Sequence, residues 1–429
     1  MFRVLSIAHG SIEAASLRKS KSVSDESFKR VNLIIDDVIK RGDKALIEST
    51  AKFDGVKLRR LRVTEDEINN AYKFVTKKQV DSLKIIKKRL TLNENKLLEN
   101  LSNIVTNSDG IRLERVIKPL YSVGCYIPGG MARYPSTVIM CATPAKIAKV
   151  KRVVITCPPL KDGSIDPLTL VSADLCDVDE IYKVGGAQAV AALAYGTETI
   201  SKVAKIVGPG GMYVNIAKII VSKQVGIDMI AGPTELVVFA DSTADPSIIA
   251  KDLIAQAEHS PDTLCGLVTK SKYLVKMVSK YLEDFLSDNA LPRKEIIRQS
   301  IRNNSFIALC KNHNVAISFI NEIAPEHLQI ICRRAKSIIN RISSAGVVLE
   351  GKYTPASASD FCLGSNHVLP TMQVAKYRGG LSVLDFVKIV SHVSANKQAL
   401  ESMKDPIKEV ALMENLPNHY QAVEERFKS

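Results

Sequence analysis

Histidines and acidic side chains occur together at a few places in this chain, and that combination can do chemistry. Of 7 histidines in 429 residues, the following lie beside carboxylates, amides or small polar residues rather than in apolar runs: His259, His327, His367 and His419. Imidazole is a common neutral metal ligand, and its unperturbed pKa is close to physiological pH. These positions therefore indicate metal coordination or acid/base catalysis.

The pair Gln256 and His259 follows a predicted helix. Asp245 is a favoured N-cap and Pro246 a favoured first helical residue, and the apolar pattern carries the helix to His259. The pair would then be i and i+3 neighbours on one face, from which both side chains could reach one ion. A polar helix end explains the pair equally well, and glutamine is an uncommon zinc ligand.

Glu326 and His327 are adjacent and follow Pro325, which we expect to hold Ala324 in extended backbone after a helical pattern over 315–323. A carboxylate beside an imidazole could divide the acid and base roles of a proton transfer. Adjacent glutamate and histidine are also common on protein surfaces, so this pair alone does not establish catalysis.

Small polar residues fill two segments, Ser357 to Asp360 and Gly364 to Pro370, the second of which contains His367. Loops of this kind present side chains to functional sites. The alternative interpretation is a series of Asx and Ser turns.

The elements that must position these residues change in type along the chain. An apolar stripe from Phe28 to Val38, with Ser24 as a cap and Gly42 as a stop, predicts a helix in a helical first hundred residues. From about residue 120, short β-branched runs alternate with helical patterns, which indicates an α/β fold with largely parallel sheets. Helical, charged sequence returns after about residue 380. The predicted strands are 153–156, 181–184, 205–207, 235–240, 267–269, 306–309 and 347–349.

Glycine-rich turns leave several of these predicted strands and would let backbone approach a ligand closely. They are residues 128–130, 185–188, 208–211 and 231–234. No Gly-x-Gly-x-x-Gly opens a helix, so the ordinary dinucleotide fingerprint is absent, and most glycine turns after strands are only turns.

The composition of the chain limits the kinds of molecule that it is expected to bind. The net charge is +14, but the densest basic stretch, Lys73 to Arg89, has apolar residues at helical spacing, which favours a solvated helix face over a nucleic-acid patch. The absence of tryptophan and the 5% aromatic content fit poorly with base stacking. We therefore expect no nucleic-acid partner.

The 8 cysteines form no Cys-x-x-Cys pair, so a disulfide framework or cysteine-bound zinc is not expected, and any metal should have nitrogen and oxygen ligands. No apolar run reaches the roughly 18 residues of a membrane helix, and the first ten residues lack the layout of a secretory signal. A cytoplasmic location without a membrane partner is the expectation.

Eight ordered motifs, spread over nearly the whole chain, resemble those of the histidinol dehydrogenases. They are Gly124–Gly130, Val184–Ala189, Gly208–Gly210, Ala231–Glu235, Gln256–His259, Pro325–Leu328, Ser344–Gly346 and Gly364–Pro370. The resemblance implies a zinc-dependent homodimer that oxidises L-histidinol to L-histidinal and then to L-histidine, passing a hydride to NAD in each step.

The resemblance also implies roles for individual residues. His327 would accept the alcohol proton, and Glu326 would activate the water that hydrates the aldehyde. Thr234 stands where serine is usual and keeps the hydroxyl for substrate contact. The zinc ligands would be Gln256, His259, Asp360 and, from the partner subunit, His419. The substrate would be contacted by Thr234, Gln256, His259, His327, Asp360, His367, Glu414 and His419, with Glu414 also from the partner subunit.

For the cofactor, Tyr126 and Gln188 match positions that contact NAD in this family, and Gly211 stands at a third such position where asparagine is usual. The loss of that one side-chain hydrogen bond would cost about 0.5–1.5 kcal/mol of binding.

The fold implied by the resemblance has two incomplete, aldehyde-dehydrogenase-like Rossmann domains. We expect an N-terminal extension over 1–23, a first domain from 24–124 and 241–380, a second over 125–240, and a helical arm over 381–429 that reaches the partner's site. Two other functions fit parts of the pattern: a zinc hydrolase, which would not depend on NAD, and a basic nucleic-acid-binding protein on an old enzyme scaffold.

Overall fold

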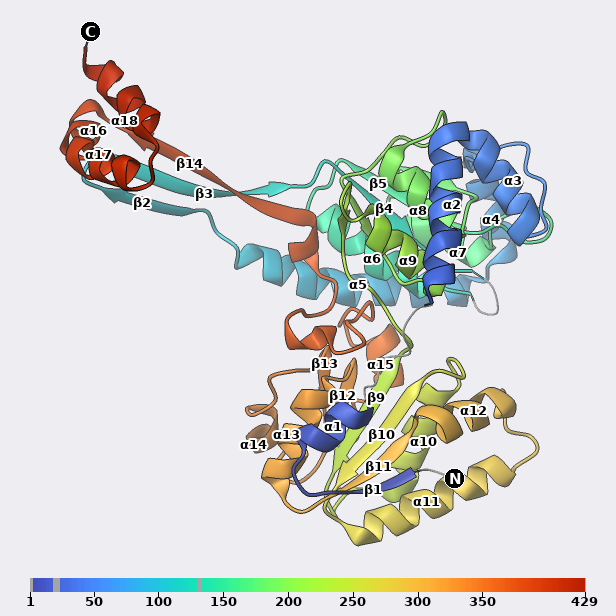
Figure 1. Cartoon of the computed structure of the whole chain (residues 1–429). Coiled ribbons are helices and arrows are strands. Elements are labelled where there is room, and N and C mark those ends of the chain that lie inside the picture. Colours follow the sequence, from blue (N-terminus) through green and yellow to red (C-terminus); the bar gives the residue numbers. More distant parts are fainter. Residues whose placement is uncertain (1–2, 18–23, 130–132, 429) are drawn as a thin grey trace. The chain divides into compact units, whose positions relative to one another are not determined.

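The computed structural model describes residues 3–17, 24–129 and 133–428 of the chain (Figure 1). Gly130 of the predicted turn at 128–130 and residues 18–23 of the predicted N-terminal extension lie outside these ranges. The contacts divide the chain into two units: Met1–Asn95 with Leu120–Phe386, and Lys96–Pro119 with Val387–Ser429. The first unit contains two parallel sheets with flanking helices, so the predicted α/β class is confirmed.

The larger sheet has six parallel strands in the order β1-β11-β10-β9-β12-β13. Its strands are β1 (Arg3–Ile7), β9 (Glu235–Ala240), β10 (Leu264–Thr269), β11 (Phe306–Cys310), β12 (His327–Ile331) and β13 (Val347–Glu350). The helices around it are α1 (Ser11–Leu17), α10 (Pro246–Ala257), α11 (Lys272–Ser287), α12 (Lys294–Asn304), α13 (His313–Ile323), α14 (Ala335–Ile339) and α15 (Ala356–Phe361).

The period-two pattern of β9 explains how this sheet is covered on both faces. Leu236 and Val238 pack in one core with α10, α11 and α12, whereas Val237 and Phe239 pack in another with α1 and α13. Because successive side chains of a strand point to opposite faces, a continuous apolar run is what a strand buried on both faces requires.

The smaller sheet has five parallel strands in the order β6-β5-β4-β7-β8. They are β4 (Ser122–Tyr126), β5 (Arg152–Thr156), β6 (Glu180–Tyr182), β7 (Lys205–Val207) and β8 (Gly226–Ile227). Helices α6 (Pro135–Ile147), α7 (Pro167–Leu175), α8 (Gly186–Tyr195) and α9 (Met212–Val221) connect them, and α2 (Asp25–Arg41), α3 (Asp43–Phe53) and α4 (Glu65–Ala71) pack outside.

Helix α2 confirms the predicted first helix: Ser24 accepts a hydrogen bond from the backbone N–H of Ser27 at one end, and Gly42 ends the helix. Its stripe of Val31, Ile35 and Val38 is buried in the same core as the alanine-rich α8. Residues 24–124 are predicted to form one domain with 241–380, whereas α2 packs on α8 and α9 of the smaller sheet. The small side chains of α8 allow this close approach. The domain boundaries as a set stay a prediction.

Helix α5 (Lys77–Glu99) carries the basic stretch that the sequence analysis assigned to a solvated helix face. Leu83, Ile86 and Leu90 are buried, while most of the lysines between them are exposed, as the helical spacing predicted. Three short 3-10 turns complete the first unit: η1 (Tyr72–Phe74), η2 (Val374–Lys376) and η3 (Val383–Phe386).

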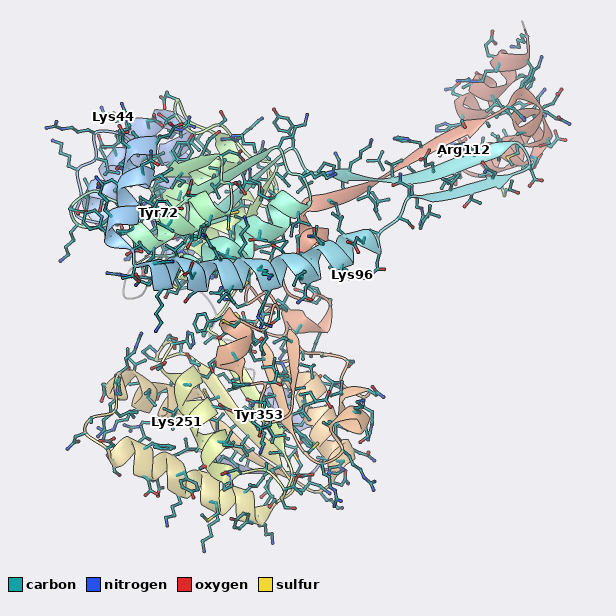
Figure 2. All side chains as sticks on the ribbon, turned by 180° about the vertical axis from the view of Figure 1, so that it is seen from behind. Lys44, Tyr72, Lys96, Arg112, Lys251 and Tyr353 are labelled. Carbon is teal, nitrogen blue, oxygen red and sulfur yellow. The ribbon has the colours of Figure 1, made fainter. Side chains whose placement is uncertain are left out.

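The second unit is an antiparallel sheet followed by helices. Its strands, in the order β14-β3-β2, are β2 (Ile104–Ser108), β3 (Ile111–Pro119) and β14 (Val387–Ala395), and its helices are α16 (Lys397–Ser402), α17 (Lys404–Met413), α18 (Pro417–Glu424) and the turn η4 (Glu425–Phe427). Figure 2 shows side chains standing clear of this sheet, with Arg112 of β3 among them, and β2 is exposed along its whole length. The helices after residue 380 were predicted, but β14 was not.

All seven predicted strands are present, with ends within a few residues of those expected. The strands that were not predicted in the first unit include β4 and β12, and the second of these carries His327. None of the helices in the described part of the chain is both long and apolar enough to cross a membrane.

Candidate active site

The candidate catalytic residues meet where two neighbouring strands begin. Strands β9 and β12 are parallel and paired with His327 opposite Leu236, so Glu326 and Thr234 come side by side at their amino ends. Helix α10 follows β9 and runs back along the sheet, which returns Gln256 in its last turn to the same end. Residues more than 90 positions apart in sequence are thus brought together by strand register.

The Glu326 carboxylate is buried and held by two donors. The Thr234 hydroxyl donates to Glu326 Oε2 at 2.5 Å, and the backbone N–H of Glu235 donates to the same oxygen at 2.8 Å. Thr234 Oγ1 in turn accepts from Gln256 Nε2 at 2.8 Å. A chain of hydrogen bonds therefore runs from a predicted metal ligand through a hydroxyl to a predicted base.

His327 is 2% exposed and is fixed through both ring nitrogens. Nδ1 lies 3.1 Å from the carbonyl oxygen of Glu235, and Nε2 lies 3.0 Å from Asp360 Oδ1. Burial alone would lower the pKa of His327, but the charge of Glu326 and the hydrogen bond to Asp360 outweigh burial and raise the pKa to about 10. These contacts therefore favour a charged imidazole between the carboxylates of Glu326 and Asp360 at neutral pH.

Asp360 lies in the last turn of α15. Burial would raise the pKa of its carboxyl, but the hydrogen bond from His327 and the charge of that imidazole lower the pKa below the ordinary value, with smaller effects from the neighbouring His367 and His259 side chains. His259, one turn after Gln256 and exposed at the end of α10, is close enough to Asp360 to take part in this effect. The helix ends at Ala257, but the N–H of His259 still bonds to the carbonyl of Gln256.

His367 has both ring nitrogens engaged within the chain. Nδ1 lies 2.7 Å from the carbonyl oxygen of Asp360, and Nε2 lies 3.2 Å from the hydroxyl of Thr137 in α6. Burial lowers the pKa of His367, which keeps the ring neutral. The loop after Asp360 thus folds back on α15, and His367 in this loop contacts the backbone carbonyl of Asp360, a predicted zinc ligand.

The backbone around Glu326 is strained and tightly packed. Ala324 ends α13 with φ of 47°, in the left-handed region, so the expectation that Pro325 would hold it extended was wrong. This conformation costs a residue with a side chain about 1–3 kcal/mol. Gly346 packs so closely that a Cβ there would lie 2.6 Å from the carbonyl oxygen of Glu326. The direction in which Glu326 leaves the backbone is therefore tightly constrained.

The residues predicted to contact NAD lie at the carboxyl ends of strands in the smaller sheet. Tyr126 ends β4, is buried, and accepts the N–H of Gly186 at the start of α8 through its hydroxyl at 3.1 Å. Gln188, in the first turn of α8, is also buried. Gly211 is the N-cap of α9, and a Cβ there would have no atom within 4 Å. Ligands of open α/β sheets bind at this end of the strands.

The last two predicted residues belong to the second unit. Glu414 ends α17 and His419 lies in α18, and both line a groove of about 460 Å³ with apolar side chains. The apolar lining residues are Met403, Pro406, Ile407, Val410, Ala411 and Leu416. The first unit thus brings together seven of the nine predicted metal, substrate and catalytic residues, and the second unit holds two.

Within the described ranges, no three histidine, cysteine, aspartate or glutamate side chains are arranged to hold a metal ion. The predicted ligands nevertheless have suitable chemistry. Gln256 uses its amide nitrogen for Thr234, so its amide oxygen is the atom for a metal, and His259 and Asp360 add a nitrogen and an oxygen donor. Gln256, His259 and Asp360 therefore give the first unit three nitrogen and oxygen donors.

Glu235 has no role predicted from the sequence, although it is the last residue of the motif Ala231–Glu235. It is the first residue of β9, is 2% exposed, and contacts both Glu326 and His327. The available signal was a glutamate directly before the apolar run Leu236–Ala240. A charge at the edge of a buried strand requires partners, which the sequence does not name.

Comparison with known proteins gives consistent results. The family model described as histidinol dehydrogenase matches residues 17–427. The histidinol dehydrogenase of Clostridium acetobutylicum is 46% identical over 405 residues, covering 94% of this chain and 93% of that protein. That of Methanocaldococcus jannaschii is 40% identical over 417 residues, covering 97% and 96%. A crystal structure of histidinol dehydrogenase from Elizabethkingia anophelis matches with a TM-score of 0.93 at 33% identity, over 100% of this chain and 99% of that one.

Proposed function

The chain belongs to the histidinol dehydrogenase family, the oxidoreductases of the last step of histidine biosynthesis, and we propose that it oxidises L-histidinol to L-histidine through L-histidinal with two NAD. The observation that carries the proposal is the pair Glu326 and His327, buried side by side and each held in one orientation by the chain. Two oxidations separated by a hydration require two proton-transfer groups, and this pair provides them.

His327 is the proposed base for each oxidation. As hydride leaves the carbon of the alcohol for NAD, the hydroxyl proton goes to Nε2, the ring nitrogen that faces Asp360. While the carboxylate of Asp360 faces that nitrogen, the nitrogen carries a proton, because the pKa of His327 is raised to about 10. It becomes an acceptor once the carboxylate of Asp360 is engaged elsewhere, as metal ligation would do.

Glu326 is the proposed base for the hydration of histidinal between the oxidations. Its Oε2 accepts from Thr234 and from the backbone of Glu235, which fixes the carboxylate plane. The other oxygen, Oε1, is then the atom that takes a proton from the attacking water. Burial keeps bulk water from competing at this position.

The proposed zinc ligands are Gln256, His259, Asp360 and His419, a set of nitrogen and oxygen donors that fits the metal. Zinc, when bound, would orient the substrate amine and imidazole and polarise the alcohol oxygen. The first unit offers only three of these donors, which supports the proposal that His419 and the neighbouring Glu414 come from the partner subunit. The proposal thus includes a homodimer with shared sites, located in the cytoplasm.

The test is the stoichiometry of NADH formation. Histidinol and NAD are added to purified protein loaded with zinc, and NADH is counted per histidinol consumed, before and after chelation. We expect two NADH per histidinol, lost on chelation and restored by zinc. A verified dimer with bound zinc that produced no NADH would contradict the proposal and favour a zinc hydrolase.

The shared site has a separate test in subunit complementation. Glu326→Ala and His419→Ala should each be inactive as homodimers, because each lacks one part of every site. A mixed dimer contains one site with both residues intact and one site with neither. It should therefore recover up to about half of the activity of a wild-type dimer. Mixed dimers without activity would contradict the assignment of His419 to the partner's site.

A further inference from the structure

Glu235 is a buried residue whose side chain contacts Glu326 and whose backbone contacts both Glu326 and His327. Its Oε2 accepts the backbone N–H of Glu326 at 3.2 Å, while its own N–H donates to Glu326 Oε2 at 2.8 Å. Its carbonyl oxygen lies 3.1 Å from His327 Nδ1. Its second carboxylate oxygen, Oε1, accepts the backbone N–H of Met372 at 3.0 Å. One residue therefore ties together the starts of β9 and β12 and the loop around Met372.

We propose that Glu235 is a positioning residue for the reaction proposed above, acting through Glu326 and His327 without touching the substrate. This inference rests on the proposed function. The reciprocal pair of hydrogen bonds fixes both the backbone and the carboxylate of Glu326. The backbone carbonyl of Glu235, held in place by these contacts, accepts a hydrogen bond from Nδ1–H of His327, which leaves Nε2 as the reactive nitrogen and sets the plane of the ring.

The role requires a carboxylate and not merely a polar side chain of that size. Both oxygens accept from backbone N–H groups, and a carboxylate is an acceptor at both positions. In Glu235→Gln, the amide nitrogen would face one of these N–H donors, so one contact becomes two opposed donors. Glu235→Asp keeps the acceptors but shortens their reach by one methylene.

The experiment compares wild type, Glu235→Gln, Glu326→Gln and the double variant in histidinol oxidation with saturating NAD. We expect Glu235→Gln to lower kcat roughly tenfold to a hundredfold, since a displacement of about 1 Å in a catalytic group has effects of this size. KM for NAD and the zinc bound per subunit should stay within about twofold of wild type. The loss in the double variant should be well below the product of the two single losses, because Glu235 acts partly through Glu326.

Glu94→Gln is the matched control. Glu94 is also buried, and its Oε2 accepts the backbone N–H of Val383 at 2.6 Å, so the same substitution has a similar burial cost in another part of the first unit. We expect kcat of Glu94→Gln within about twofold of wild type. Should Glu235→Gln not fold, Glu235→Asp is compared in its place, with an expected loss of roughly tenfold.

The outcomes separate this inference from the function on which it rests. Wild type without histidinol-dependent NADH would overturn both. Wild type with normal turnover, together with an unchanged kcat in Glu235→Gln or in its aspartate substitute, would overturn only the role of Glu235. A loss in the double variant equal to the product of the single losses would show that Glu235 does not act through Glu326 and would overturn the positioning role.

Discussion

The two parallel sheets of the first unit bury charge in different ways. At the amino ends of β9 and β12, the carboxylates of Glu235 and Glu326 are surrounded by backbone N–H groups, a hydroxyl and an imidazole. In the smaller sheet, the ammonium of Lys218 in α9 and the carboxylate of Asp228 are fully buried against each other. The first arrangement contains an imidazole, His327, whose pKa is raised to about 10 by neighbouring carboxylates, whereas the second is a fixed ion pair.

The two arrangements of buried charge differ because they hold different groups in place. Lys218 Nζ donates to the carbonyl of Gly208 at 3.1 Å, and Asp228 Oδ2 accepts the N–H of Gly208 at 2.7 Å. Both peptide groups of the glycine that turns the chain after β7 are thus tied by a permanent charge pair. A loop that only has to stay in place is suited to such a pair, while a base needs partners that leave it free to ionise.

The largest expected effect concerns the imidazole. The pKa of His327 is about 10 in the metal-free folded chain and near 6.5 when unfolded, so its proton is bound more tightly in the folded state. The resulting stability is fully present below pH 6.5 and is lost as the pH rises toward 10. The contribution is at most about 5 kcal/mol, and it is measured as the difference between wild type and His327→Gln in urea unfolding of zinc-free protein at pH 6, 8 and 10.

His313→Gln is the control for this titration. The pKa of His313 is lowered, first by partial burial and then by the charge of Lys270, so its linkage to stability acts below pH 6.5. The difference in unfolding free energy between wild type and His313→Gln should not shrink between pH 8 and 10. A constant difference for His327→Gln over the alkaline range would show that the pair with Asp360 does not hold a proton in the folded chain.

Breaking the ion pair of Lys218 and Asp228 should lower the free energy of unfolding. Lys218→Met leaves the Asp228 carboxylate buried without its cation, which costs about 3–5 kcal/mol of unfolding free energy. Arg30→Met removes an exposed partner of Glu26 and should leave the free energy of unfolding nearly unchanged, because solvent screens that pair. Urea unfolding at pH 7 checks both, and a loss below 1 kcal/mol for Lys218→Met would mean that water reaches Asp228.

Helices and strands could be predicted from the sequence where they bury one clear apolar face or consist of a continuous apolar run. Helix α2 could be placed to the residue because its stripe, its serine cap and its terminal glycine agree. Strand β14 could not, because its apolar residues are mostly exposed and leave no one-sided pattern to read. Strand β12 was hidden for another reason, since it begins at His327 itself and its start was interpreted only as chemistry.

The candidate site was predicted as residue types and not as contacts. The motifs named Glu326 and His327, but the bonds that orient them come from Thr234 and Glu235, more than 90 residues earlier. Only the parallel pairing of β9 with β12 brings the two segments together, and pairing over such separations has no local signal. The left-handed Ala324 shows the same limit, because tertiary packing there overrides the local preference set by Pro325.

A smaller effect should follow from weakening the neutral donors around Glu326. Thr234→Val keeps the shape but removes the donor to Glu326 and the acceptor for Gln256. Leaving these partners unsatisfied costs about 1–3 kcal/mol, which corresponds to roughly a tenfold to hundredfold loss in kcat. Thr234→Ser keeps the hydroxyl and should remain within about twofold of wild type in the same NADH assay. Equal rates for the valine and serine variants would remove Thr234 from the positioning of the base.

The smallest effect should come from the loop held by the fixed pair. Gly211 has φ of −68° and ψ of −179°, which any residue can adopt, and the space for a Cβ is open. Gly211→Asn introduces the side chain that the family resemblance implies at this position. If Gly211 lies at the proposed NAD site, we expect NAD to bind a few-fold to about tenfold more tightly by calorimetry, the value of one hydrogen bond. Gly211→Ala adds the Cβ without the amide and should bind NAD as wild type does. If alanine strengthened binding as much as asparagine, the gain would come from a stiffer loop, and the fixed pair of Lys218 and Asp228 would then be insufficient to hold that loop by itself.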